Sequence, residues 1–117
     1  MQYVCLVYLV EKDMNAMTKK ESDTCIDESL AYDDALRKAG HLIIAHALQP
    51  VEAATTIRVR SGKLSATDGP FAETKEQLGG LMLIEARDLN DAIQVAAKIP
   101  MARRGSIEVR PIRELRP

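Results

Sequence analysis

Apolar residues are almost continuous near the start of the chain, from Tyr3 to Val10, and three charged residues follow at once. Successive side chains of a strand point to opposite faces, so an unbroken apolar run predicts a strand that is buried on both sides. The segment 80–86 has the same character, because apolar side chains would point to both faces of a strand there as well. Both segments are therefore predicted to be strands with no face suited to water.

Two other segments have helical spacing. Within residues 18–39, a set of side chains recurs at intervals of three and four, which predicts a helix with one narrow face turned inward. Gly40 follows this segment, and glycine is common just after the end of a helix. A second helix is predicted to begin after Asp88, which is a good N-cap residue, and to end before Pro100. The stripe of the first helix consists of Cys25, Ser29, Tyr32, Leu36 and Ala39.

The remaining periodic segments predict further strands at 41–48, 55–60, 64–67 and 106–112. The order is then β-α-β-β, a small hairpin arm, and β-α-β. This order predicts a single domain over residues 1–117 with a ferredoxin-like split βαβ fold of the α+β class. Its antiparallel sheet would carry both helices on one face.

Two helices on one face leave the other face of the sheet uncovered, although the strands 3–10 and 80–86 are apolar there as well. A chain of 117 residues has no segment left to cover it. A large exposed apolar face is unusual in a soluble monomer. We therefore expect a homodimer in which the two sheets face each other.

The composition of the chain excludes some classes of binding partner. Apolar residues make up 46% of the chain and charged residues 28%, which is typical of a globular protein, and the net charge is −1. One Phe, three Tyr and no Trp argue against a surface that stacks nucleic-acid bases. No apolar run approaches the length of a membrane span, and no leader pattern opens the sequence. We expect a cytoplasmic protein that binds neither nucleic acid nor membrane.

The candidate functional residues lie in the second half of the chain and in one predicted strand of the first half. Two cysteines without CxxC spacing and two histidines without matching carboxylates predict no metal site, and the absence of a Gly-rich phosphate loop predicts no organic cofactor. His46 lies in phase with apolar neighbours, so it is either a core or interface residue or a proton-transfer group. Arginines that could hold an anion, or only form a solvated surface, are Arg58, Arg60 and Arg103.

The loop 67–80 is the densest in shape-specific and ionisable residues. Asp68 either accepts backbone N–H groups of the loop or serves as a cleft carboxylate. Phe71, the only Phe of the chain, either pins the loop to the core or forms the apolar wall of a pocket. Lys75 either pairs with nearby carboxylates or contacts a ligand. We expect Asp68 and His46 to bound one cleft as acid and base.

The same loop resembles the YCII-related proteins of the DGPF-domain branch. The resemblance lies in Asp68-Gly69-Pro70-Phe71 with Glu73, Lys75-Glu76 and Gly79-Gly80, and extends to the segments 36–40, 47–50, 56–60 and 108–111. It implies a dimeric ferredoxin-like α/β barrel. It also implies membership of a superfamily that contains small-molecule isomerases, lyases and cofactor-free oxygenases. Some relatives are encoded beside, or fused to, alternative sigma factors.

A His–Asp pair in the cleft has been proposed as catalytic in YCII proteins. Here the first helix contains no His, so this pair is not carried over to this chain. Two hypotheses for the function result. The first is a cofactor-independent enzyme or ligand-binding barrel for a small anionic or apolar molecule, with its pocket between helix and sheet. The second is a non-enzymatic dimeric module with a regulatory role in transcription.

Overall fold

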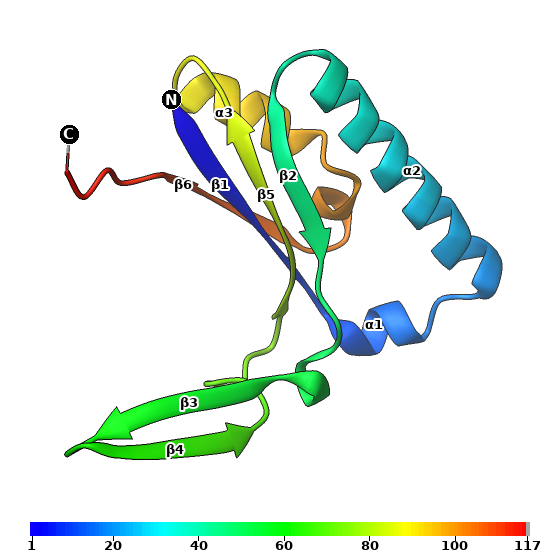
Figure 1. Cartoon of the computed structure of the whole chain (residues 1–117). Coiled ribbons are helices and arrows are strands. Elements are labelled where there is room, and N and C mark those ends of the chain that lie inside the picture. The colour runs from blue at the N-terminus through cyan, green and yellow to red at the C-terminus, as the bar shows by residue number, and fades with distance from the viewer. Residues whose placement is uncertain (117) are drawn as a thin grey trace.

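A four-stranded antiparallel sheet forms the centre of the computed structural model, which describes residues 1–116 (Figure 1). The strand order is β2-β5-β1-β6, and every neighbouring pair is antiparallel. The strands are β1 (Gln2–Leu9), β2 (Leu42–Ala47), β5 (Gln77–Glu85) and β6 (Ser106–Pro111). This is the order of a split βαβ fold, so the predicted ferredoxin-like class is confirmed.

Two helices cover one face of this sheet, as predicted. Helix α2 (Lys19–Lys38) begins at a capping box in which Thr18 and Glu21 satisfy each other's backbone N–H groups. It ends at Lys38, and Gly40, two residues later, has a φ of 82°, which is costly for residues with a side chain. Helix α3 (Leu89–Ala97) begins at Asp88, whose carboxylate accepts the N–H of Asp91. Of these features, Gly40 and Asp88 had been identified from the sequence, whereas the capping box at Thr18 had not.

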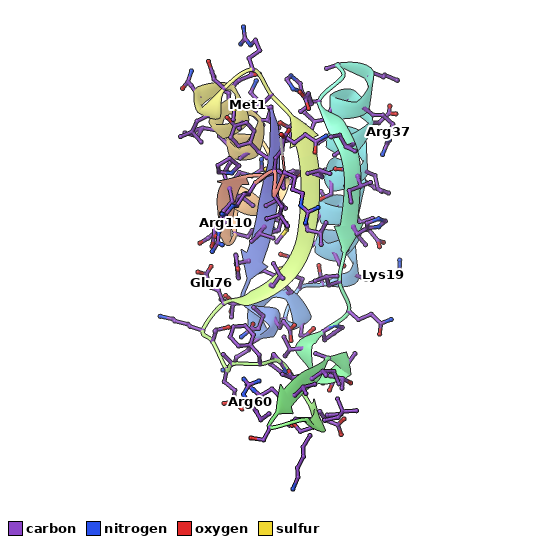
Figure 2. All side chains as sticks on the ribbon, turned by 60° about the vertical axis from the view of Figure 1, so that its left-hand side comes forward. Met1, Lys19, Arg37, Arg60, Glu76 and Arg110 are labelled. Carbon is purple, nitrogen blue, oxygen red and sulfur yellow. The ribbon has the colours of Figure 1, made fainter. Side chains whose placement is uncertain are left out.

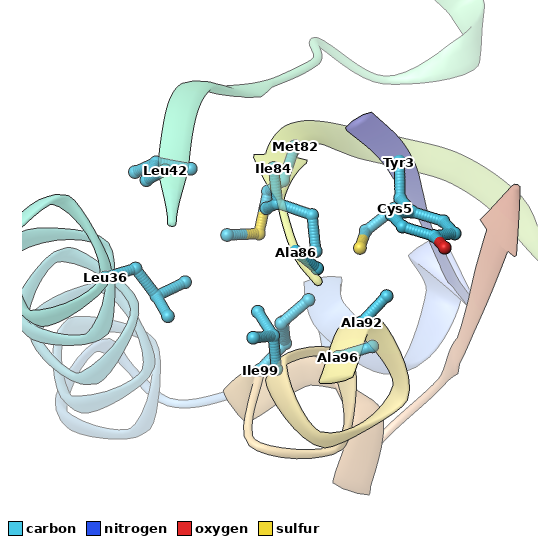
Figure 3. Close-up of a cluster of buried hydrophobic side chains, with 11 residues drawn as sticks. Tyr3, Cys5, Leu36, Leu42, Met82, Ile84, Ala86, Ala92, Ala96 and Ile99 are labelled. Atoms are coloured by element: carbon cyan, nitrogen blue, oxygen red, sulfur yellow. The ribbon is translucent and has the colours of Figure 1, made fainter. Parts of the chain in front are cut away.

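The core lies between the sheet and these helices (Figure 3). Cys5 and Ile84 are completely buried in it, on the inward faces of β1 and β5. The hydroxyl of Tyr32 donates a hydrogen bond of 2.6 Å to the carbonyl oxygen of Val95, which ties α2 to α3. Burial raises the pKa of the Cys5 thiol to about 11, so this cysteine stays protonated at neutral pH.

Three short helices were not predicted. Helix α1 (Glu11–Asn15) follows β1 directly, where the sequence analysis expected only the end of a strand. The 3-10 helices η1 (Val51–Ala53) and η2 (Pro100–Arg103) lie before β3 and after α3. Segments this short have too few periodic positions to stand out in a sequence. Strand β5 also begins at Gln77, three residues before the predicted start.

The predicted hairpin arm is confirmed and stands apart from the main sheet (Figure 1). It consists of β3 (Thr55–Arg60) and β4 (Lys63–Asp68), paired only with each other. The radius of gyration is 16.2 Å, whereas a compact domain of this length has about 13 Å. Ile57 and Leu64 belong to one face of the arm and are 56% and 71% exposed. The arm therefore presents apolar side chains to the outside of the subunit.

The face of the main sheet opposite the helices is also uncovered, and we call it the open face. Residues directly opposite each other in a sheet share a face, and the registers give two rows across the strands. Figure 2 looks onto this side, with both helices behind the sheet and the arm below. The rows are Ile44, Leu83, Val4 and Arg110, and then His46, Leu81, Leu6 and Glu108.

The open face thus has an apolar centre and a charged margin on β6, where Arg110 forms an ion pair with Glu108. Within one chain its apolar residues are half-buried or exposed, and Ile44 reaches 42% exposure. The expectation that the second face of the sheet is apolar is confirmed. Among residues 1–116, no helix is both long enough and apolar enough to cross a membrane.

Candidate functional site

An apolar space lies between α2 and the sheet, and we call it the α2 cavity. Its volume is about 380 Å³, which is within the range of small-molecule sites in proteins. The sheet contributes Val7 and Met82 to its floor, while α2 forms one wall and η2 closes an end with Pro100 and Met101. Met14 of the unpredicted helix α1 also reaches it. A ligand here would meet a mainly hydrocarbon surface.

A few polar groups interrupt this surface, and most of them come from α2. Cys25, Ser29 and Asp33 recur at intervals of four, so they lie along one stripe of the helix that faces the sheet. The cavity mouth is bordered by Ile26 and Leu30, which are 52% and 62% exposed. Apolar walls with a small number of placed polar groups are the usual composition of a ligand pocket.

Asp33 is the polar group with the clearest electrostatic effect. Desolvation by the surrounding protein raises the pKa of its carboxyl, and the nearby charge of Arg37 only partly opposes this. A raised pKa means that the folded state disfavours the ionised form. Asp33 therefore destabilises the fold at neutral pH. Residues that reduce stability in a pocket often serve function.

We expect Asp33→Asn to raise the melting temperature at pH 7, because the amide avoids the desolvation cost of a carboxylate. The gain should shrink as the pH falls toward the ordinary aspartate pKa of about 3.9 and vanish below it, where the carboxyl is protonated in folded and unfolded chains alike. Asp34→Asn is the matched control, since Asp34 is exposed and pairs with Lys38. Thermal melts that show no gain for Asp33→Asn over Asp34→Asn would contradict this account.

The structure separates the predicted catalytic pair. His46 borders the α2 cavity on β2, and its register with Leu81 puts it in a row of the open face. Asp68 ends β4 on the arm, is exposed, and lines none of the cavities described for residues 1–116. One chain therefore forms no described cleft bounded by both residues. Their acid–base role stays a prediction.

The loop around Asp68 is held by other groups than the sequence analysis expected. The hydroxyl of Thr56 donates to the carbonyl oxygen of Gly69 at 2.8 Å, and the N–H of Gly69 donates to Ala54. Within residues 1–116, the described hydrogen bonds include none to the carboxylate of Asp68. Thr56, which the sequence analysis passed over, organises this turn instead.

Phe71 does not pin the loop to the core, because it is 80% exposed. It borders a wide hollow of about 640 Å³ where the arm meets the sheet, together with Tyr8, Leu48 and Leu78. The alternative role, an apolar wall, is therefore the one that fits its position. The polar junction beneath this hollow is tied by Glu11, which accepts the N–H of Val51 and whose own N–H donates to Gln77.

The predicted cationic residues fall in different places. Arg58 and Arg60 are exposed on the arm, on the face opposite Ile57, and Lys75 is exposed in the loop before β5. Arg103 pairs with Glu28 of α2 at 2.7 Å and lines a small cleft beside the α2 cavity. Of these four, only Arg103 borders one of the described cavities. Among residues 1–116, no three His, Cys, Asp or Glu side chains gather as metal ligands would.

Comparison with known proteins agrees with this architecture. The model of the YCII-related domain matches residues 1–116. An uncharacterised protein of Rhizobium meliloti (strain 1021) is 37% identical over 119 residues, which cover 100% of this chain and 96% of that protein. The match thus extends over the sheet, both long helices and the arm.

Proposed function

Because the chain belongs to the YCII-related family, we propose that it is a dimeric α/β barrel that binds a small, mainly apolar molecule in the α2 cavity of each subunit. The observation that carries this proposal is the cavity itself. It has about 380 Å³ of space, hydrocarbon walls and a stripe of polar groups at Cys25, Ser29 and Asp33. The sequence Asp68-Gly69-Pro70-Phe71 supports the DGPF branch of the family.

Assembly of two chains through the open face is the second part of the proposal. The apolar centre of this face would be hidden, and the opposite charges of Arg110 and Glu108 at its margin are self-complementary under a two-fold axis. The arm extends on the side of the sheet away from α2 (Figure 1), so its apolar face could pack on the same partner. One second copy would account for the uncovered apolar surfaces of both the open face and the arm.

Selective alkylation of Cys25 tests the binding site. In the described residues both cysteines are free, Cys5 is completely buried with a raised pKa, and Cys25 lines the cavity at intermediate exposure. Iodoacetamide, a small neutral reagent, should therefore modify Cys25 first, because the thiolate is the reactive species. We expect 4-phenylbutan-1-ol to slow this reaction several-fold at saturation, as followed by mass spectrometry.

Ser29→Leu should abolish this protection, since the larger side chain occupies the cavity. Ala31→Leu is the matched control on the exposed side of the same helix, and it should respond to the alcohol as the wild type does. If the alcohol protects neither Cys25 nor the fold against heat, the cavity is not a binding site. The alternative of a regulatory module without a ligand would then be favoured.

A further inference from the structure

A second, smaller cleft adjoins the α2 cavity at the N-terminal end of α2, and we call it the basic cleft. It has about 260 Å³ of space, and Cys25 and Pro100 line both hollows. The charged residues that line it are Lys20, Glu21, Glu28, Arg103 and Arg104. A molecule seated in the apolar cavity could therefore extend one end past Cys25 into charged surroundings.

The two carboxylates of the basic cleft already have partners. Glu28 pairs with Arg103 at 2.7 Å. Glu21 accepts the backbone N–H of Thr18 at 3.1 Å, and these hydrogen bonds with Thr18, helped by the charge of Arg104, lower the pKa of Glu21. By contrast, neither Lys20 nor Arg104 takes part in the ion pairs found within residues 1–116. The cleft thus has two cations free to pair with an incoming anion.

The charge of the combined site changes from one end to the other along α2. Asp33 lies in the α2 cavity thirteen residues after Lys20, which is roughly 20 Å along a helix at 1.5 Å per residue. A ligand anion next to Asp33 would meet a like charge that is already poorly solvated. The same anion beside Lys20 and Arg104 would gain charge-assisted hydrogen bonds. The charges therefore favour one orientation of a bound molecule.

From this arrangement we infer that the ligand is an amphipathic anion, with a compact apolar body in the α2 cavity and one carboxylate in the basic cleft between Lys20 and Arg104. The inference rests on the proposed function, because it assigns the other end of the same site. A cavity of about 150 Å³ holds benzene, so the 380 Å³ here suits a body of one ring with a short chain.

Two compounds that differ only at one end test this. We would measure the binding of 4-phenylbutyrate and 4-phenylbutan-1-ol by protection of Cys25 from iodoacetamide, at low and at high salt. The acid should bind about tenfold more tightly than the alcohol at low salt, and high salt should reduce this advantage because ionic pairing at the surface is screened. In the variant Lys20→Gln/Arg104→Gln the advantage should disappear while the affinity for the alcohol is retained.

Arg60→Gln is the matched control, since Arg60 is an exposed arginine on the arm and lines none of the cavities described for residues 1–116. It should keep the preference for the acid. If the alcohol protects Cys25 but the acid binds no better, the assignment of the anion is wrong and the proposed binding site stands. An acid preference that survives the double substitution also overturns it. If neither compound protects Cys25, both proposals fail.

Discussion

The variant Leu6→Asp is expected to be a folded monomer, whereas the wild type is expected to be a dimer. Leu6 lies at the middle of the open face, between Leu81 of β5 and Glu108 of β6. In a face-to-face dimer the new carboxylate would be buried without a partner and beside Glu108. A buried unpaired charge costs about 3–5 kcal/mol, which corresponds to an increase in the dissociation constant of roughly a hundredfold to several-thousandfold.

Sedimentation velocity at micromolar concentration gives the mass of each species, and circular dichroism reports whether the subunit stays folded. Leu6→Met controls for the change of side chain and should remain dimeric. Gln94→Glu adds a carboxylate on the exposed surface of α3 and should also remain dimeric. A wild type that sediments as a well-folded monomer would show that the open face needs no second copy.

Gly105→Ala is expected to have the largest effect on the stability of the subunit. A Cβ atom at this position would lie 2.0 Å from the carbonyl oxygen of Tyr8 and 3.2 Å from the Cα atom of Leu9. Both contacts are with backbone of β1, so the connection from η2 to β6 would have to move. Overpacking of this kind costs about 1–3 kcal/mol or more, and the melting temperature should fall by roughly 5–15 °C.

Gly79→Ala is the matched comparison. There the new Cβ atom would lie 2.6 Å from Cδ2 of Leu9, which is the movable end of a side chain. This substitution should therefore cost clearly less than Gly105→Ala in the same thermal melts. Equal losses for the two variants, or a negligible loss for Gly105→Ala, would mean that the approach of η2 to β1 is less close than the structure has it.

The long elements of this fold could be predicted because local signals and tertiary packing agree. Thr18 and Gly40 delimit α2 by hydrogen bonding and by backbone conformation, and neither effect depends on distant residues. The unbroken apolar character of β1 is different, because it reports on both faces of the sheet at once. It correctly indicated that the face opposite the helices is apolar.

The candidate site was less predictable, because a cavity depends on which elements end close together. Cys25 and Ser29 were placed on the inward stripe of α2, but the sequence does not reveal that space remains between this stripe and the sheet. Asp33 adjoins this stripe, and a carboxylate beside an inward-facing stripe was the available signal. The closing residues Met14 and Pro100 come from short helices whose pattern is too brief to read.

For the loop 67–80, the sequence suggested a site that the structure of one chain does not form. Its density of unusual residues suggested a site at Asp68 and a buried Phe71, whereas the structure exposes both on or near the arm. An aromatic residue next to a Gly-Pro turn was expected to be buried, but in one chain Phe71 only borders an open hollow. The hollow beside Phe71 opens at the junction of arm and sheet.

A crystal structure of the protein grown with 4-phenylbutyrate would test the central claim most directly. We predict that the phenyl ring lies in the α2 cavity beside Ser29, with the carboxylate directed toward Lys20 and Arg104, in subunits that pair through their open faces. The claim would be contradicted if the compound were absent from the cavity at saturating concentration, or were bound instead in the hollow beside Phe71.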